Sequence, residues 1–377
     1  MGWISLTDAD GPFGPYGGQT DPFAAAPGSD CSAPARTALQ SDLLEFGSVV
    51  AEFQLPADTC GPLLRFDRMC GWQRHLSFDL LAGGTLRLRH RQGGSQTELL
   101  LGIAASDQPS LLRLTYGWNA PQRFCTLTAE TIDDGNIRQI RGSNPLPMPV
   151  DDAIAMAASK RMTATHPGMI WFGVARGNDT IGIAPCCTGA TPILTPSGYQ
   201  RIDSLGPGDL ISTLDNGPMP LLGVSRHDLP ARGSFAPLLL RSPYFGNRID
   251  LFVAAQQRVA LAGAEVEYLF GEDEVLVEAR HLVNGQSALW ERPRPMVRYY
   301  SLLLDGAAVI DAAGCRMECA SPSNHEPALG QLQPSGPGGV AAANPAAPTA
   351  LSRPVLRSYE AIALQAMREH QRNPIAA

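Results

Sequence analysis

Short segments in which hydrophobic and polar residues alternate recur along most of the first half of the chain. They occupy residues 48–55, 75–82, 85–91, 97–104, 111–118 and 124–131, with turn signals such as Gly83-Gly84 and Gly93-Gly94 between them. Alternation over about four to eight residues, repeated at short intervals, is typical of antiparallel β-sandwiches. We therefore expect residues 41–185 to form one β-sandwich, closed by a strand at residues 169–176, with a single helix at residues 151–160.

A second block of short, strand-like segments follows Cys186. These segments occupy residues 191–196, 199–205, 209–215, 220–229, 238–243, 250–261, 274–283 and 299–305. Turn signals such as Asn284-Gly285 separate them. The expected fold class is all-β, with a second domain at residues 186–320 behind the sandwich. In the spacing of its segments, the first block resembles the concanavalin-type jelly rolls.

Three segments outside these blocks differ in character. Residues 1–40 are rich in Gly, Pro, Ala and Ser without a hydrophobic period, which predicts a flexible arm. Residues 321–353 have a similar composition and are expected to be a linker. Residues 354–372 predict an amphipathic helix that docks on its own protein or on a partner protein. Its expected hydrophobic stripe consists of Leu356, Tyr359, Ile362, Ala363, Ala366 and Met367.

Composition narrows the classes of function. Of the 377 residues, 44% are hydrophobic and 17% are charged, which indicates folded domains. The net charge of -7 argues against nucleic acid and anionic lipid as partners. No segment has the ~18 consecutive apolar residues that a membrane-spanning helix needs, and the N-terminus lacks the pattern of a secretory signal. We therefore expect a cytoplasmic protein, or one exported by a non-classical route.

Eight cysteines are spread over the chain. They are too sparse for a disulfide scaffold, and no pair has the spacing of a zinc site. We expect neither a metal nor a cofactor, and buried thiols in a reducing compartment. Only Cys186 lies in a segment with a further chemical signal.

Cys186 opens a series of four ordered blocks. It starts the run Cys186-Cys187-Thr188-Gly189, which residues 198–220 follow with the sequence GYQRIDSLGPGDLISTLDNGPMP. Residues 254–259 have the sequence AAQQRV, residues 274–285 have EVLVEARHLVNG, and residues 299–307 have YYSLLLDGA. Together these blocks resemble the Hedgehog/intein (Hint) domains, specifically the bacterial type common in alphaproteobacteria. The resemblance covers a little over a third of the chain.

The resemblance implies self-directed chemistry at Cys186. The first cysteine of a Hint domain attacks the carbonyl of the preceding residue and converts the peptide bond into a thioester, which a second nucleophile then opens. In this chain that bond is Pro185–Cys186. A thiol is mostly protonated at neutral pH and an amide nitrogen is a poor leaving group. The reaction therefore needs an imidazole that protonates the leaving nitrogen and a donor that holds the oxyanion.

The later blocks depart from the family pattern at these helper positions. Gln257 stands where the family has histidine, and Ala254 stands where it has serine or threonine. Ser301 and Ala307 replace both histidines of the closing block. Loss of a general acid or base slows such a reaction by about 10²–10⁴-fold. We therefore expect self-cleavage to be lost or very slow, which leaves a scaffold or a binding protein.

Other interpretations of these residues stay open. There are three interpretations of Cys186: a residue that has lost its catalytic role and is kept by packing, a working nucleophile, or a redox-active partner of Cys187. If Cys186 works as a nucleophile, a relocated acid such as His281 or His227 replaces the missing imidazole; otherwise these are ordinary structural or solvent-facing histidines. Asp209 belongs to the Gly-Asp turn of the family and is expected to be structural.

The sandwich suggests a different class of function, which is ligand binding. Trp72, Tyr116 and Trp118, together with His75, would line a sugar-binding face if their rings point outward, because aromatic rings stack on pyranose faces. The competing interpretation places these rings in the core. On the binding hypothesis, residues 41–185 recognise a glycan or a partner protein and the rest of the chain displays them.

Overall fold

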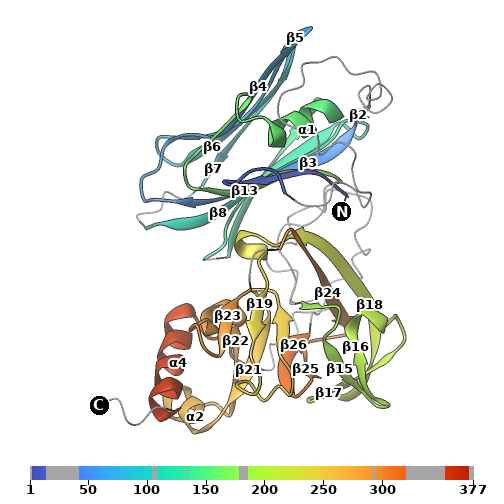
Figure 1. Cartoon of the computed structure of the whole chain (residues 1–377), viewed down its shortest axis with the longest axis vertical. Helices are drawn as coiled ribbons and strands as arrows, with labels where there is room; N and C mark the ends of the chain where they lie inside the picture. The colour runs from blue at the N-terminus through green and yellow to red at the C-terminus, as the bar shows by residue number, and fades with distance from the viewer. Residues whose placement is uncertain are drawn as a thin grey trace. The chain divides into compact units, whose positions relative to one another are not determined.

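The computed structural model describes residues 2–13, 42–103, 108–133, 135–177, 186–291, 294–319 and 353–372. Strands dominate these residues, so the all-β fold class is confirmed. The described residues divide into two compact units, residues 2–177 and residues 186–372 (Figure 1).

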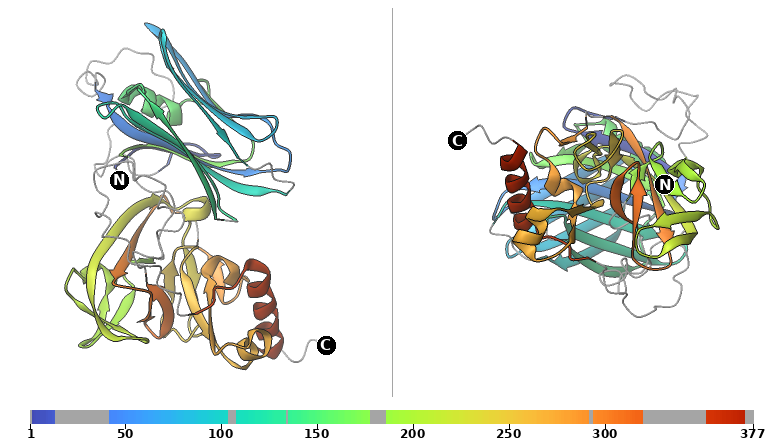
Figure 2. Two further views of the ribbon diagram at one scale, coloured as in Figure 1. Left: turned by 180° about the vertical axis from the view of Figure 1, so that it is seen from behind. Right: turned by 90° about the horizontal axis from the view of Figure 1, so that it is seen from below.

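The first unit contains two antiparallel sheets (Figures 1 and 2). The larger sheet has, in spatial order, β1 (Gly2–Asp8), β13 (Met169–Arg176), β3 (Phe46–Leu55), β8 (Ser110–Asn119), β9 (Phe124–Thr131) and β10 (Asn136–Ser143). The second sheet has β12 (Thr163–Thr165), β4 (Gly61–Cys70), β5 (Trp72–Leu81), β6 (Thr85–Gln92) and β7 (Ser95–Gly102). A short ribbon of β2 (Leu43–Leu44) and β11 (Met148–Pro149) leads into helix α1 (Val150–Ala158).

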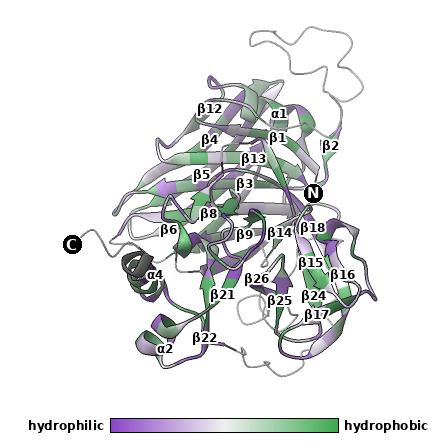
Figure 3. Ribbon diagram, turned by 60° about the horizontal axis from the view of Figure 1, so that its bottom comes forward, coloured by the Kyte–Doolittle hydropathy of each residue, from purple (hydrophilic) through white to green (hydrophobic). Residues whose placement is uncertain are grey.

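Alternation along the strands builds the core of this sandwich. On β6, Leu86 and Leu88 are buried, and Arg87 and Arg89, which alternate with them, are partly exposed. Figure 3 shows such bands of hydrophobic and hydrophilic residues along the strands. Buried side chains of both sheets join in one cluster. Each large apolar side chain in it contributes about 1.5–3 kcal/mol by leaving water.

The start of the chain differs from the sequence-based expectation. We predicted a flexible arm over residues 1–40, but Gly2–Asp8 form β1, which pairs antiparallel with β13. Trp3 and Leu6 are buried, which explains why this segment is held to the sheet. The rest of the predicted arm, from residue 14, lies outside the described residues.

The second unit is built on a long, curled antiparallel sheet (Figure 1). Its spatial order is β22 (Glu274–Glu278), β21 (Arg258–Ala262), β26 (Cys315–Cys319), β25 (Ala308–Ala312), β17 (Leu210–Thr213), β18 (Gly217–Pro230), β24 (Met296–Leu304), β14 (Cys187–Thr188), β20 (Leu251–Val253), β19 (Leu238–Leu240) and β23 (Ala288–Trp290). The strands β15 (Pro192–Thr195) and β16 (Gly198–Arg201) pair with each other beside β25. Helix α2 (Ala264–Phe270) and the 3-10 helices η2 (Ile202–Ser204), η3 (Gly233–Phe235) and η4 (Ala279–Leu282) connect strands.

The C-terminal segment docks on this second unit. Val355 makes a parallel bridge with Leu276 of β22, and two backbone hydrogen bonds of 2.9 Å join Leu276 to Pro354 and Leu356. Helix α4 (Ser358–Arg372) follows and packs with Ala361 and Leu364 in the core. The segment therefore extends the sheet at the edge of β22 before the helix covers it.

The helix was predicted at residues 354–372 and is confirmed, but the expected docking stripe is wrong. Leu356 is buried, whereas Tyr359 and Ile362 are 61% and 60% exposed. Apolar residues lie on more than one side of α4, because Ala361 and Leu364 are buried while Tyr359 and Ile362 are exposed. Hydrophobic spacing alone does not decide which of two such faces packs. The predicted linker at residues 321–353 lies almost entirely outside the described residues.

Candidate functional site

Cys186 lies directly before β14, in the centre of the curled sheet. The strand β14 is hydrogen-bonded between β20 and β24, with Cys187 opposite Val253 on one side and Tyr300 on the other. The backbone N–H of Ala254 donates to the carbonyl of Cys186 at 3.0 Å. Cys186 is only 2% exposed. Residues 178–185 lie outside the described residues, so the structure gives no geometry for the Pro185–Cys186 bond.

Gly189, three residues after Cys186, lies where the chain passes close to other side chains. A Cβ atom on Gly189 would lie 2.9 Å from the ring of Tyr300 and 3.0 Å from a carboxylate oxygen of Asp203. Both distances are shorter than side chains tolerate, so this position needs glycine. The tight passage between β14 and η2 fixes the path of the chain just beyond the two cysteines.

Burial dominates the electrostatics of Cys186. Removal from water disfavours the thiolate and raises the thiol pKa well above its ordinary value, and the neighbouring Cys187 raises it further. The Ser301 hydroxyl works in the opposite direction and lowers the pKa. Burial also raises the pKa of Cys187, to about 12. The thiol of Cys186 is therefore overwhelmingly protonated at neutral pH.

Ser301 is the polar side chain that faces Cys186. It lies on β24, is 3% exposed, and affects the pKa of the Cys186 thiol through a side-chain contact. The contact falls short of regular hydrogen-bond geometry, and Ser301 Oγ has no other partner among the described residues. A buried hydroxyl without a regular partner is unusual, because leaving such a group unpaired costs free energy.

Gln257 is held by structural hydrogen bonds. Its Nε2 donates to the carbonyls of Arg258 at 3.0 Å and Glu318 at 2.9 Å, which ties the start of β21 to β26. Its Oε1 accepts a weak hydrogen bond from the thiol of Cys187 at 3.9 Å. The side chain thus contacts the second cysteine of the pair, and all its polar atoms are used.

Two further positions from the family pattern contribute no functional side chain. Ala254 is 1% exposed and contributes only its backbone N–H to Cys186. Ala307 is half-buried in the turn between β24 and β25. Asp209 lies in the turn before β17, where its side chain accepts the N–H of Gly206 at 2.8 Å and its carbonyl accepts the N–H of Leu221 at 2.8 Å.

The structure separates the two candidate histidines. His281 lies on η4, with Nε2 3.9 Å from the carboxylate of Glu278. His227 lies on β18 opposite Tyr299 of β24, and Ser225, two residues away, lies opposite Ser301. Because side chains two residues apart share a face of a strand, His227 lies on the same face as Ser301. Of the two, register therefore relates only His227 to the site.

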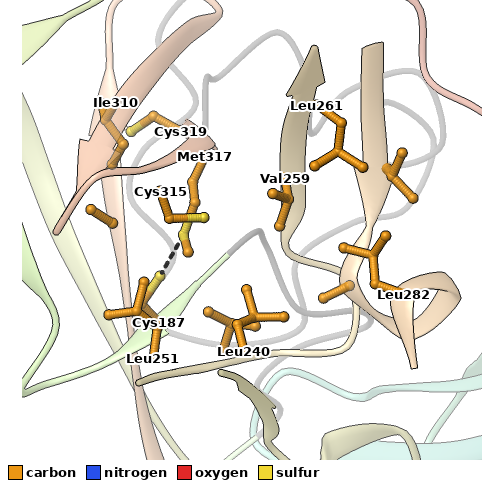
Figure 4. Close-up of a cluster of buried hydrophobic side chains, with 14 of the residues drawn as sticks. Cys187, Leu240, Leu251, Val259, Leu261, Leu282, Ile310, Cys315, Met317 and Cys319 are labelled. Carbon is orange, nitrogen blue, oxygen red and sulfur yellow. Dashed lines mark hydrogen bonds between the residues drawn. The ribbon is translucent and has the colours of Figure 1, made fainter. Parts of the chain in front are cut away.

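A group of sulfur atoms lies beneath this site, in the core of the second unit (Figure 4). The Sγ of Cys187 lies 3.6 Å from the sulfur of Met317. Cys315 is buried beside them, and the thiol of Cys319 donates to the carbonyl of Leu302 at 3.0 Å. Burial also raises the pKa of the Cys315 thiol. These thiols behave as small hydrophobic groups.

The residues predicted to form a sugar-binding face do not gather on one surface. Tyr116 and Trp118 are both 0% exposed and stack in the sandwich core, so the prediction that they bind sugar is wrong. Their strand β8 is central in its sheet and turns these rings inward. Trp72 is 52% exposed at the start of β5, under the guanidinium of Arg74. His75 is 9% exposed and hydrogen-bonded to Asp67 and Ser77.

Comparison with known proteins decides the family of the second unit. The Hint domain family matches residues 185–324. The second unit contains a Hint domain. The match starts at residue 185, one residue before Cys186. No curated protein matches the chain.

Solved structures similar to the chain include Hint-type folds and a carbohydrate-binding fold. An intein-like domain from Clostridium thermocellum is 13% identical, covers 37% of this chain and 100% of its own, and has a TM-score of 0.28. The MchDnaB-1 intein is 14% identical, covers 35% and 98%, and has a TM-score of 0.25. The CBM40 of a Ruminococcus gnavus sialidase, bound to α2,6-sialyllactose, is 14% identical, covers 36% and 78%, and has a TM-score of 0.27. At these scores no property passes from those proteins to this chain.

None of the helices in the described residues is both long and apolar enough to cross a membrane. In the same residues, no three His, Cys, Asp or Glu side chains converge to hold a metal ion.

Proposed function

We propose that the Hint domain of this chain has lost self-cleavage at Pro185–Cys186, or carries it out very slowly, and serves as a folded scaffold attached to the sandwich. The observation that carries this proposal is the surroundings of the Cys186 thiol. Within the described residues, Cys187 and Ser301 act on this thiol and Tyr299 interacts with it electrostatically, and none of the three is a general acid at neutral pH, since burial raises the pKa of Tyr299 well above its ordinary value.

Two requirements of the reaction are unmet at this thiol. The attacking species is the thiolate, and burial keeps Cys186 protonated. The departing nitrogen needs a proton, and a serine hydroxyl and a glutamine amide do not supply one at neutral pH. Gln257 is also committed to the carbonyls of Arg258 and Glu318, so its amide is not free to turn toward Cys186. Self-cleavage is therefore slow for two reasons: the thiol is protonated, and the leaving nitrogen has no proton donor.

The competing function is active self-cleavage with a relocated histidine. The register of β18 and β24 favours His227 for this role over His281, because His227 shares a face with Ser301. On that account a His227→Ala variant would abolish cleavage that the wild type shows, whereas His281→Ala would leave it unchanged.

The proposal predicts that returning imidazoles to the helper positions restores cleavage. We expect the double variant Gln257→His and Ser301→His to cleave about 10²–10⁴-fold faster than the wild type, which is the contribution of a positioned general acid or base. The measurement is a time course of the full-length chain on a denaturing gel, with and without added thiol. The fragments expected are residues 1–185 and 186–377.

Two controls define this experiment. Adding Cys186→Ala to the double variant must abolish the new cleavage, because the thiol is the nucleophile. Ser225→His places an imidazole on the neighbouring strand, opposite position 301, and tests whether any nearby histidine suffices. Wild-type protein that already cleaves within minutes, in a manner lost with Cys186→Ala, would contradict the proposal.

A further inference from the structure

The outer face of the second sandwich sheet carries an ordered polar network. Strands β4 to β7 turn their apolar side chains, among them Leu76, Phe78 and Leu88, into the core. The residues that alternate with them on β5 and β6 point to the opposite side of the sheet. We call this side the arginine face; it consists of His75, Ser77 and Asp79 on β5, and Arg87, Arg89 and Arg91 on β6.

A continuous chain of hydrogen bonds crosses the arginine face. Asp67 of β4 contacts Nδ1 of His75 at 2.8 Å, and Nε2 of His75 contacts the Ser77 hydroxyl at 3.1 Å. Ser77 donates to Oδ2 of Asp79 at 3.2 Å. The same Oδ2 accepts from Arg87 at 3.2 and 3.3 Å and from Arg89 at 3.3 Å. The two guanidinium groups are thus held in place by one carboxylate.

The arginines nevertheless keep surface and hydrogen-bonding capacity for a ligand. The side chains of Arg87 and Arg89 are 29% and 33% exposed, while Asp79 beneath them is 10% exposed. Their contacts to Asp79 lie at the long end of the hydrogen-bond range. Nε of Arg89 is buried and has no hydrogen-bond partner in the described part of the chain, so the exposed ends of the two guanidinium groups are the donors that a ligand can reach. One carboxylate oxygen therefore serves two guanidinium groups that can bind a second anion.

The geometry of the strand sets the spacing of these positive charges. Arg87, Arg89 and Arg91 alternate with buried residues, so they project from one face at intervals of about 7 Å. Arg89 lies opposite Ser77 on β5, and Arg91 lies opposite His75. The result is a straight row of cationic donors beside a row of hydroxyl, imidazole and carboxylate groups.

The hydrogen bonds from Asp67 through His75 to Ser77 have the order of a nucleophilic triad, but the face is not built for catalysis. Ser77 is 0% exposed, so a substrate carbonyl cannot reach it. The backbone N–H groups of β5 are engaged with β4 and β6, so none is free to hold an oxyanion.

We propose that the arginine face binds an acidic polysaccharide, a sugar chain that carries carboxylate or sulfate groups. Guanidinium groups bind such anions by paired, charge-assisted hydrogen bonds. The buried row of Asp79, Ser77 and His75 fixes the arginines in place but does not itself reach a ligand, so recognition falls to the guanidinium groups. A nucleic acid backbone would use the same donors, but the net charge of -7 opposes a densely charged polyanion.

The test is binding of the full-length chain to polygalacturonate and to heparin, measured by calorimetry at low and at physiological salt. We expect binding to at least one of them that weakens as salt rises. The double variant Arg87→Gln and Arg89→Gln should weaken it about 10-fold or more, because each lost charge-assisted hydrogen bond is worth more than a neutral one. The control variant Arg138→Gln and Arg141→Gln removes the same charge from exposed positions of β10 and should bind as the wild type does.

Further arms of the experiment separate the remaining outcomes. Arg91→Gln leaves the Asp79 contacts intact and should still weaken binding, which guards against a double variant that merely unfolds. Polygalacturonate with its carboxyl groups reduced should not bind. Equal binding of the reduced polymer, binding of single-stranded DNA alone, equal loss in the β10 control, or no binding of either acidic polymer would overturn the proposal. None of these outcomes depends on whether the Hint domain cleaves.

Discussion

At the residue scale, burial of the Cys186 thiol opposes formation of the thiolate that the reaction needs. Cys186 lies near the start of the residues that match the Hint domain, and the fold encloses its side chain almost completely. In a working site a nearby imidazole would offset the cost of forming a charge there. The group that faces Cys186 is the Ser301 hydroxyl, and its effect is smaller than that of burial.

This imbalance predicts slow alkylation of Cys186. Because the pKa of its thiol is raised, the thiolate fraction at neutral pH is below that of an ordinary cysteine and increases only as the pH rises toward the raised value. Exposed Cys60 in the same chain is the internal control. With iodoacetamide on the native protein, followed by peptide mass analysis, Cys60 should react quickly. Cys186 should react slowly, and faster at alkaline pH. Labelling of Cys186 at the rate of Cys60 at neutral pH would show a stabilised thiolate and would contradict this account.

At the scale of secondary-structure elements, the C-terminal segment completes the Hint unit. The chain around Val355 lengthens the sheet beside β22, and Arg353 forms ion pairs with Glu274 and Asp215. Helix α4 then places Leu364 in the core, and Gln365 donates to the carbonyl of Leu282 at 2.8 Å. The edge of β22, which would otherwise be open to pairing with other chains, is covered.

The two faces of α4 provide a matched pair of variants. Leu364 is 1% exposed and Ile362 is 60% exposed. Leu364→Ala should lower the free energy of unfolding of the Hint unit by about 2–5 kcal/mol, because it removes buried methyl groups and leaves a cavity. Ile362→Ala should change it by less than about 0.5 kcal/mol. Urea unfolding of the full-length chain measures both. Equal effects of the two variants would mean that α4 does not dock in solution as described.

At the scale of the whole molecule, the sequence predicted the architecture better than the chemistry of individual positions. Strands with alternating residues, such as β13 at residues 169–176, were found where the pattern placed them, because alternation follows directly from a sheet with one buried face. The N-terminal strand was missed because seven residues beside a Gly- and Pro-rich stretch carry too little pattern.

Contacts between distant segments were beyond the pattern of hydrophobic and polar residues. That pattern does not indicate that Ser301 meets Cys186 or that Gln257 meets Cys187, because these contacts depend on how the curled sheet closes; the family resemblance alone pointed to positions 257 and 301. The sequence left open whether the rings of Tyr116 and Trp118 lie on a surface or in the core, because composition does not reveal which face of β8 is inward. The arginine face was missed as well, although the alternation of Arg87, Arg89 and Arg91 on β6 contained its signal.

The central claim is that the chain remains whole. The most direct measurement is the intact mass of freshly purified full-length protein, followed over days with and without hydroxylamine, beside Cys186→Ala. The account predicts one species with the mass of residues 1–377 in every sample. A mass for residues 1–185 ending in a hydroxamate, present in the wild type and absent from Cys186→Ala, would reveal a thioester at Cys186 and contradict the account.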